Sequence, residues 1–354
     1  MKKQNISKKI LYWYDNNKRQ LPWRKYTSEK QKKYFTLVSE IMLQQTQVKT
    51  VIPYFNNFIL KIPNLKSLSK VKDQKLLKYW EGLGYYSRAR NLHFTAKYIV
   101  ENYDGVFPSN YHEILQLKGV GFYTAAAISS FCFGLPYAVV DGNVIRVLSR
   151  FFGIEDPYDT ASGKKVYTNL AQDLLDRNHH AENNQAIMDF GASQCVPKSP
   201  KCILCPLNSD CVAYNTNSVH LFPVKSKKLK VKRRFLNYLL IQNKDAIILG
   251  KRAEGIWKGL YDLPFIEFPH PKAEELVIVS SKWKRIFEKS HYKIQVVSDE
   301  FLHKLSHQHI YAKFWLISVD NIELEKYYFV TKSQLKNYPV SRLTDKFFKV
   351  YNII

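Results

Sequence analysis

The sequence predicts an all-α domain followed by an α+β domain, and three observations support this fold class. Apolar residues recur at helical spacing from the N-terminal region to about residue 213. A basic run over residues 225–234 then ends that pattern. Beyond the run, segments rich in β-branched and aromatic residues predict strands. The length of 354 residues also exceeds one domain of ordinary size and favours two.

In the first part, glycines and prolines separate the periodic segments, which is where helix ends are expected. The predicted helices cover residues 37–47, 73–79, 89–101, 111–117, 123–133, 144–152 and 163–175. The uncharged stretch 119–140 is long enough to raise the question of a membrane span. Because Gly134-Leu135-Pro136 interrupts it, we expect a buried helix and a turn there, and no membrane span. The all-α domain is predicted over residues 1–217.

The remainder of the chain divides into a linker and a second domain. Seven of the ten residues from 225 to 234 are Lys or Arg, a composition that does not pack by itself. We therefore interpret residues 218–234 as a basic linker. Strands are predicted over 235–241, 246–250 and 310–318, within an α+β domain over residues 235–354.

The charge balance indicates a polyanionic partner. Lys and Arg number 54 against 30 Asp and Glu, for a formal net charge of +24. Such a surface attracts DNA or RNA, although a lysine-rich solvated surface is the alternative. The 45% of hydrophobic residues indicate globular folding. The first ten residues are charged and lack the apolar stretch of a signal peptide, so we expect a cytoplasmic protein.

Four of the five cysteines form a C-x6-C-x2-C-x5-C array at Cys195, Cys202, Cys205 and Cys211. In a reducing compartment, four thiols within 17 residues favour metal ligation over disulfides. Both zinc and a 4Fe-4S cluster accept four cysteine ligands. Structural zinc sites generally use two C-x2-C pairs, whereas only Cys202 and Cys205 form one here.

Two further motifs lie between the predicted helices. Leu117-Lys118-Gly119-Val120-Gly121 predicts a tight turn whose backbone N–H groups could hold a DNA phosphate, or a turn that merely caps a helix. Val140-Asp141-Gly142-Asn143 places an acid at the end of an apolar run, where Asp141 taken singly could be only a helix N-cap.

In this order and spacing, the glycine turn, the Asp141 motif and the cysteine loop resemble the helix-hairpin-helix glycosylase superfamily over nearly all of the first 213 residues. The resemblance implies two helical subdomains with a cleft between them, into which a base is flipped from double-stranded DNA. The cysteine spacing resembles the cluster loop of endonuclease III and MutY glycosylases. It implies a 4Fe-4S cluster in the loop 195–211.

The segment 39–48, which reads SEIMLQQTQV, resembles the MutY family of adenine DNA glycosylases. Adenine is a poor leaving group as an anion, so cleavage of its N-glycosidic bond calls for an acid and for a carboxylate that stabilises the sugar cation. The resemblance gives these roles to Glu40 and Asp141, with Tyr123 and Asn143 as supporting polar residues. Without it, a helical Glu would be interpreted as a solvated surface residue.

Tyr123 stands where the bifunctional endonuclease III enzymes have a lysine, which implies a monofunctional glycosylase. The resemblance also implies DNA or substrate contacts by four residues that could instead belong to the core or to loops: Arg24, Gln45, Tyr85 and Asp189. The segment between Arg24 and Glu40, residues 25–39, is longer than the corresponding segment usually is in the family. We interpret them as a surface insertion.

The second domain resembles the MutY domain that reads 8-oxoguanine, and Trp257-Lys258-Gly259-Leu260-Tyr261 belongs to its W-x-G-L-Y stretch. This resemblance implies a Nudix-like fold. Since no Nudix box of carboxylates is present, we expect recognition and not hydrolysis. Ser306 and His307 match the family loop that contacts the oxidised purine, or form a polar hairpin tip. Leu305 replaces the family's aromatic residue, which predicts softer discrimination between 8-oxoguanine and guanine.

The sequence is therefore identified as a member of the MutY family, predicted to be a monomer that excises adenine opposite 8-oxoguanine or guanine. A glycosylase of the same superfamily for mismatched thymine or an oxidised pyrimidine is the first alternative. A non-catalytic DNA-binding iron-sulfur protein is the second. The pair of Glu40 and Asp141 disfavours a non-catalytic protein.

Overall fold

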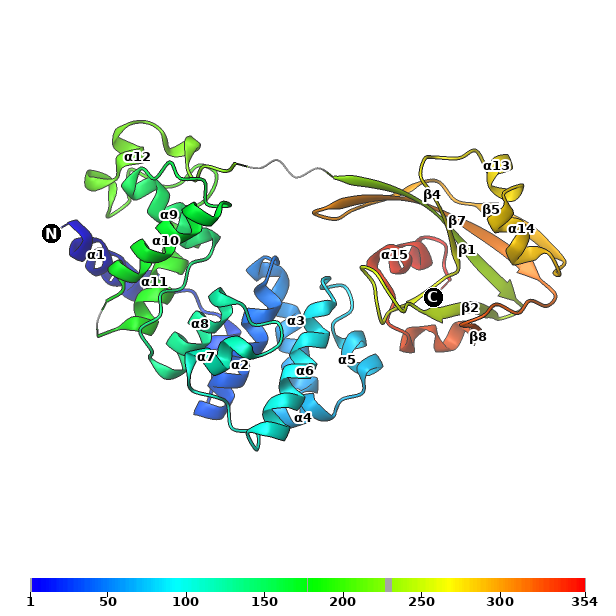
Figure 1. Cartoon of the computed structure of the whole chain (residues 1–354), viewed down its shortest axis with the longest axis horizontal. Coiled ribbons are helices and arrows are strands. Elements are labelled where there is room, and N and C mark those ends of the chain that lie inside the picture. Colours follow the sequence, from blue (N-terminus) through cyan, green and yellow to red (C-terminus); the bar gives the residue numbers. More distant parts are fainter. Residues whose placement is uncertain (1, 177, 227–230, 354) are drawn as a thin grey trace. The chain divides into compact units, whose positions relative to one another are not determined.

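The computed structural model describes residues 2–176, 178–226 and 231–353 (Figure 1). The chain divides into two compact units, Met1–Lys70 with Asn91–Lys228 and Val71–Arg90 with Leu229–Ile354. The predicted domains placed residues 71–90 with the first part of the chain. In the structure this segment belongs to the second unit, where the Val340 amide donates a 2.8 Å hydrogen bond to Glu81 Oε1. No helix among the described residues is long and apolar enough to cross a membrane.

The first unit is all-α, as predicted. Its helices are α1 (Lys2–Asn17), α2 (Glu29–Leu43), α3 (Val48–Lys61), α4 (Leu65–Lys70), most of α6 (Ser87–Asn102), α7 (Tyr111–Gln116), α8 (Phe122–Phe133), α9 (Gly142–Phe152), α10 (Ala161–Leu174), α11 (His180–Ser193) and α12 (Val212–Asn215). Short 3-10 turns are η1 (Pro22–Arg24), η2 (Asn208–Asp210) and η3 (Val219–Leu221). One core of this unit lies between α1, α9, α10 and α11, around Ile6, Leu148 and Phe190.

Helix α2 begins at Glu29 and not at residue 37, which corrects the interpretation of residues 25–39 as a surface insertion. The Ser28 side chain caps the helix by accepting a hydrogen bond from the Gln31 amide. Tyr34 and Phe35 are buried, and the Phe35 ring packs edge-on against Phe55 of α3. The extra length is thus mostly additional helix that packs against the core, and only residues 25–28 form a connection.

Helices α3 and α11 were not among the predicted segments. Pro53 lies inside α3, where it removes one backbone donor, and this residue weakens a helix prediction from sequence. The polar sequence of α11, with few apolar residues at helical spacing, explains the second omission. Both helices contribute to the cleft described below, α11 as one wall and α3 through Val48 and Lys49.

The second unit contains an eight-stranded mixed sheet within its described residues. Its elements are α5 (Asp73–Tyr79), β1 (Lys232–Asn243), β2 (Ala246–Lys251), β3 (Tyr261–Asp262), β4 (Phe265–Phe268), α13 (Glu274–Ile278), α14 (Ser281–Phe287), β5 (Tyr292–Val297), β6 (Phe301–Lys304), β7 (Gln308–Val319), β8 (Tyr327–Thr331), η4 (Lys332–Asn337) and α15 (Arg342–Val350). Strands β1 and β7 pair in parallel from Lys232 opposite Gln308 to Gln242 opposite Ser318. The other pairs are antiparallel, so the predicted α+β class is correct.

Helices cover both faces of this sheet because successive side chains of a strand point to opposite faces. On β7, Trp315 packs against Trp283 of α14, with ring centroids 5.0 Å apart. Its neighbour Phe314 stacks on Phe347 of α15 at 3.9 Å. Figure 1 shows α14 and α15 beside β1 and β7.

The predicted basic linker differs from the structure at its end. Residues 227–230 lie outside the described residues, but β1 already begins at Lys232. Arg234 then donates to Glu267 of β4 through Nε at 2.7 Å and Nη2 at 2.6 Å. The last three residues of the basic run are therefore strand residues, with a partner that the local composition did not reveal.

Candidate active site

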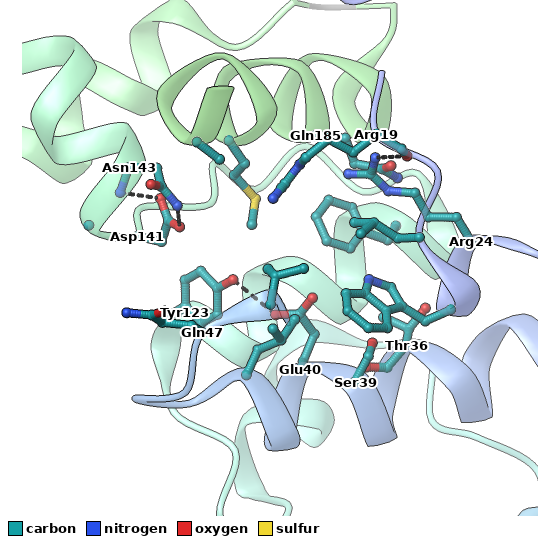
Figure 2. A pocket seen from close by; sticks show the side chains of 18 of the residues that line it. Arg19, Arg24, Thr36, Ser39, Glu40, Gln47, Tyr123, Asp141, Asn143 and Gln185 are labelled. Atoms are coloured by element: carbon teal, nitrogen blue, oxygen red, sulfur yellow. Dashed lines mark hydrogen bonds between the residues drawn. The ribbon is translucent and has the colours of Figure 1, made fainter. Parts of the chain in front are cut away.

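The first unit contains a cleft of about 1180 Å³ lined by α1, α2, α8, α11 and the start of α9. The cleft brings together residues that are more than 100 positions apart in the sequence (Figure 2). Six of the predicted site residues line it: Arg24, Glu40, Gln45, Tyr123, Asp141 and Asn143. The predicted catalytic set therefore shares one cavity.

Glu40 lies in the last turn of α2 and is only 4% exposed. Its Oε2 accepts a 2.9 Å hydrogen bond from the hydroxyl of Tyr123 (Figure 2). Burial raises the pKa of Glu40 to about 7, against the opposing effect of the Tyr123 hydrogen bond, and the nearby Asp141 raises it further. A carboxyl group with this pKa holds its proton in a good part of the population at neutral pH. It is therefore suited to act as a general acid.

Tyr123 reaches Glu40 because α8 starts at the predicted glycine turn. Gly119 has φ +86°, and a Cβ built there would lie 2.7 Å from Asn91 Cβ, so this position requires glycine. Gly121 is the N-cap residue of α8, no side chain caps this helix end, and no atom lies within 4 Å of a Cβ built at Gly121. Gln44 Nε2 donates to the Gly119 carbonyl at 3.1 Å and ties the end of α2 to the turn. The turn thus fixes the phenol beside the carboxyl group.

Asp141 is the N-cap of α9 and also a cleft residue. Its Oδ1 accepts hydrogen bonds from the amides of Asn143 at 2.9 Å and Val144 at 2.8 Å, while Oδ2 accepts from Asn143 Nδ2 at 2.7 Å. Burial raises the pKa of Asp141, and these three donors oppose the rise by stabilising the carboxylate. The capping alternative and the catalytic interpretation are therefore compatible, because the cap orients the group.

Asp189 was predicted as a polar pocket residue, but it is not among the residues that line the cleft. It is fully buried on α11 and accepts hydrogen bonds from the side chains of Arg19 and Arg24, both of which do line the cleft. Burial opposes ionisation, yet the hydrogen bonds from Arg24 and Arg19 outweigh it and hold the pKa of Asp189 below its usual value. Asp189 therefore fixes two guanidinium groups in the cleft wall.

Three cleft residues were missed by the sequence reasoning: Arg19, Gln185 and Arg146. Gln185 Oε1 accepts a 3.2 Å hydrogen bond from the Tyr14 hydroxyl and lines the cleft opposite Glu40 in Figure 2. Arg146 Nη2 donates to Asn143 Oδ1 at 2.8 Å and to the Gly191 carbonyl at 2.6 Å, so it joins α9 to α11. Nothing in the local sequence distinguishes these residues, because each depends on a partner far along the chain.

The predicted DNA-contacting residues Gln45 and Tyr85 share an unusual backbone. Gln45 has φ +56° and is exposed at the cleft. Tyr85, in the second unit, has φ +49° and a side chain that is 42% exposed, with Arg88 5.3 Å from its ring centroid. Non-glycine residues with positive φ are uncommon and cluster at functional sites, a feature that suits the predicted contacts.

The chain is similar to known DNA repair proteins in both of its parts. A family model described as HhH-GPD superfamily base excision DNA repair protein matches residues 38–172, and a NUDIX domain model matches residues 237–350. An adenine DNA glycosylase of Buchnera aphidicola subsp. Baizongia pistaciae is 39% identical over 317 residues, which is 87% of this chain and 85% of the relative. The chain belongs to the adenine DNA glycosylase family. It is a DNA N-glycosylase, and both halves of the predicted fold class are confirmed.

Other similarities of this glycosylase concern mainly its first part. The human adenine DNA glycosylase is 43% identical over 210 residues, covering 58% of this chain and 38% of the relative. The solved structure of a thermostable thymine-DNA glycosylase is 30% identical, with a TM-score of 0.55, and covers 61% of this chain and 98% of that one. An endonuclease III–DNA complex at 21% identity and a TM-score of 0.52 has the same fold.

The four predicted ligand cysteines of this glycosylase lie in the loop that follows α11, and all four are partly buried. Burial raises the pKa of Cys205 to about 11, against the opposing effect of a hydrogen bond from the Leu207 backbone. Cys195, Cys205 and Cys211 pack against the same hydrophobic core. No group of three or more His, Cys, Asp or Glu side chains in the described part of the chain is already arranged around a metal position. The donor chemistry fits an all-thiolate group.

In the second unit of the glycosylase, Ser306 and His307 are exposed in the turn between β6 and β7. The His307 carbonyl accepts a 3.1 Å hydrogen bond from the Lys232 amide, and the Leu305 amide donates a 2.8 Å hydrogen bond to the Gln308 carbonyl. These bonds fix the turn, and the side chains at its tip remain exposed. The buried carboxylate of this unit, Asp262, is satisfied by Arg252 at 2.7 Å. It therefore has a structural partner.

Proposed function

We propose that this glycosylase hydrolyses the N-glycosidic bond of adenine opposite 8-oxoguanine or guanine in double-stranded DNA. The observation that carries the proposal is the buried Glu40 carboxyl group, with a pKa of about 7, in one cleft with the hydrogen-bonded carboxylate of Asp141. The relatives named adenine DNA glycosylase support the choice of base.

The two carboxyl groups have different tasks because their surroundings differ. Glu40 donates its proton to a ring nitrogen of the flipped adenine while the C–N bond breaks, so the base leaves neutral. Asp141, held as a carboxylate by three N–H donors, stabilises the positive charge that grows on the sugar. Water then adds to the sugar carbon and its proton returns to the carboxylates. The products are free adenine and an abasic site.

The supporting residues act on these two groups. Tyr123 orients Glu40 through its hydroxyl, and Asn143 orients Asp141 while being held itself by Arg146. The Gly119–Gly121 turn would bind a DNA phosphate with the free amides at the start of α8. Gln45 and Tyr85 would contact the duplex near the mismatch.

No amine stands at position 123, so we propose a monofunctional enzyme that forms no Schiff base at this site. Borohydride added during turnover should then trap no covalent protein–DNA complex. A trapped complex would overturn this part of the proposal and indicate a lyase.

The cysteines Cys195, Cys202, Cys205 and Cys211 would hold a 4Fe-4S cluster, which would fix the conformation of the loop 195–211. Arg150 supports such a loop, because its side chain donates to the carbonyls of Val196 at 2.8 Å and Pro197 at 3.1 Å. Iron and acid-labile sulfide should be found in equal amounts in the purified protein. Zinc without sulfide would identify the alternative site.

In the second unit, Ser306 and His307 would hydrogen-bond the oxidised purine opposite the adenine. Their exposure at the tip of the β6–β7 turn supports this role. With Leu305 in place of an aromatic residue, preference for 8-oxoguanine over guanine should be modest, and Leu305→Phe should increase it. An unchanged or smaller preference in that variant would show that the ring makes no such contact.

The defining experiment is single-turnover cleavage of a labelled duplex with adenine opposite 8-oxoguanine, using the wild type, Glu40→Gln and Asp141→Asn. Adenine release by the wild type and a loss of about 100-fold to 10,000-fold in each variant would support both roles. Because a thymine-DNA glycosylase has a similar fold at 30% identity, a thymine–guanine duplex is the necessary comparison. Cleavage of that duplex alone would replace the adenine proposal.

A further inference from the structure

The cleft is larger than its reaction requires. Its volume of about 1180 Å³ exceeds the roughly 300–1,000 Å³ of sites that enclose a drug-sized ligand, and a single flipped nucleoside is smaller than such a ligand. The exposed lining residues of the cleft occur at two main places. One place has Gln45, Gln47 and Lys49, with Gly142 and Pro197 beside the start of α9 and beyond the end of α11. The other place has Lys18, Gln20 and Tyr26, with Glu182 in the first turn of α11.

Three helices show that these places are opposite ends of one passage. Near the hairpin, the end of α2 meets the start of α8 through the bond from Gln44 to Gly119. At the other end, the start of α2 meets the end of α8, where Lys33 Nζ lies 4.7 Å from the Phe133 ring centroid. The two helices are therefore antiparallel, and Glu40, in the last turn of α2, lies toward the hairpin end.

Helix α11 spans the same distance on the opposite wall. Its first residue, His180, bonds through Nδ1 to the Gly134 carbonyl at the end of α8, at 2.8 Å. Near its other end, Gly191 lies so close to Asn143 that an added Cβ would be 2.7 Å from Asn143 Cβ. Lining residues occur along its whole length, from Ala181 to Ala192, which at 1.5 Å per residue corresponds to about 17 Å. The passage is thus one helix length long.

The two ends differ in what they offer a ligand. The hairpin end carries the Gly119–Gly121 turn and the exposed Gln45 and Lys49, which suit a DNA backbone. The other end, which we call the rear mouth, is lined by Tyr26, Lys32, Thr36 and Phe131. Lys32 Nζ lies 5.6 Å from the Tyr26 ring centroid, and the Tyr26 ring is 41% exposed. Aromatic rings with a few polar groups suit a flat heteroaromatic base.

A duplex with a flipped nucleotide fills the hairpin end, and it still fills that end after the bond breaks, since the abasic sugar remains attached to the DNA. An exit for the free base should then lie away from the end that the DNA fills. We propose that the rear mouth is an exit site for the free purine base, through which adenine leaves while the enzyme is still bound to the abasic product. This inference rests on the proposed function, because it concerns the product of that reaction.

The lengthened start of α2 contributes to the rear mouth. Lys32 belongs to the helical residues that the sequence suggested to be a surface insertion, and Tyr26 belongs to the connection before them. A bulky side chain at Lys32, which is 24% exposed, should narrow the mouth without touching Glu40 two turns away. Lys30 is exposed on the same helix and does not line the cleft, so Lys30→Trp is the matched control for Lys32→Trp.

The first test separates release of the base from its cleavage. Enzyme in excess is mixed with a bead-bound duplex that carries tritiated adenine opposite 8-oxoguanine, and the beads are sedimented at intervals. Label in the supernatant is divided by the total label cleaved after denaturation, and protein on the beads is measured in parallel. We expect wild type and Lys30→Trp to release the cleaved base while the protein stays on the beads. Lys32→Trp should release it at least tenfold more slowly.

Base that leaves the wild type only together with the protein would overturn the proposal, as would equal release rates in the two tryptophan variants. The total label cleaved is the readout of the proposed function itself. Absence of any cleaved adenine in the wild type would refute that function without bearing on the passage.

The second test needs no catalysis. Because it can be made on the wild type alone, it remains informative even if the tryptophan variant does not fold. Enzyme saturated with a duplex that contains a tetrahydrofuran abasic analogue is titrated with free 2-aminopurine, whose fluorescence reports stacking. An open rear mouth lets the base enter although DNA occupies the hairpin end, and Lys32→Trp should weaken this binding at least tenfold. Binding to the free enzyme that disappears when the duplex is added would show that the hairpin end is the sole route.

Discussion

Two buried carboxyl groups near the same cleft, Glu40 on its floor and Asp189 behind its wall, have opposite protonation behaviour. Burial raises the pKa of Glu40 to about 7, and its hydrogen-bond partner is the Tyr123 phenol. Asp189 is buried at least as deeply, yet its pKa is below the usual value because Arg19 and Arg24 bind it. Burial therefore does not determine whether a carboxyl group holds a proton, and its partners do. Glu40 keeps its proton in a good part of the population at neutral pH, whereas Asp189 is ionised and holds two cations in position.

The largest effect should follow removal of the wall carboxylate. Asp189→Ala leaves two guanidinium groups without their partner and should lower the free energy of unfolding by about 4 kcal/mol, within the range for breaking a buried ion pair. Urea denaturation would measure the change. Glu182→Ala, at an exposed position of the same helix, should stay within about 0.5 kcal/mol of the wild type. A loss below about 1 kcal/mol for Asp189→Ala would contradict the importance of the pairs.

Removal of the Glu40 carboxyl group should instead raise the free energy of unfolding at alkaline pH. The pKa of Glu40 rises from 4.5 in the unfolded chain to about 7 in the fold, so the unfolded chain binds fewer protons between these values. The stability of the wild type therefore falls as the pH rises through this window, by about 3 kcal/mol in total. Glu40→Gln lacks this penalty and should be more stable than the wild type at pH 8. At pH 4 the difference should vanish, and a difference independent of pH would refute the shift.

The same protonation equilibrium should appear in the rate of base cleavage. The acid is active while Glu40 holds its proton, so the single-turnover rate should fall as pH rises through about 7 and reach a tenfold loss per pH unit above it. Rapid-quench measurements between pH 5.5 and 9 would follow this limb. A rate that stays level up to pH 9 would exclude Glu40 as the acid.

The smallest effect concerns the partner of Glu40. The Tyr123 hydroxyl lowers the pKa of Glu40 by donating a hydrogen bond, so Tyr123→Phe should move the alkaline limb of the rate profile to higher pH, by about one pH unit or less. Tyr111→Phe, which changes a tyrosine that stacks on Tyr137 away from Glu40, is the control and should leave the limb in place. Movement to lower pH in Tyr123→Phe would mean that the phenol favours the neutral acid.

Much of the fold could be predicted because its signals are local. Gly134 ends α8 and Gly119 forms the turn before it, both with positive φ. The apolar and aromatic residues of β1 and β7 identify buried strands. The prediction was wrong where a residue contacts a partner that is distant in the sequence. Residues 29–36 look like a basic surface segment, but Tyr34 and Phe35 pack against α3 and the core. Arg234 was interpreted as part of a linker, but in the structure its side chain donates a hydrogen bond to Glu267.

The sequence by itself determined the order of the two folds and the spacing of the cysteine array, because each depends on residue types that are read along the chain. It also predicted the two carboxyl residues, through the resemblance to a family. Only the tertiary structure decided that Glu40 contacts Tyr123, that Asp189 binds two arginines, and that the cleft extends along α11 from Ala181 to Ala192. A pKa depends on the dielectric and charges around a group, and a passage depends on how helices are oriented. Both are properties of neighbours that lie 80 to 170 positions apart in the sequence and become contacts only on folding.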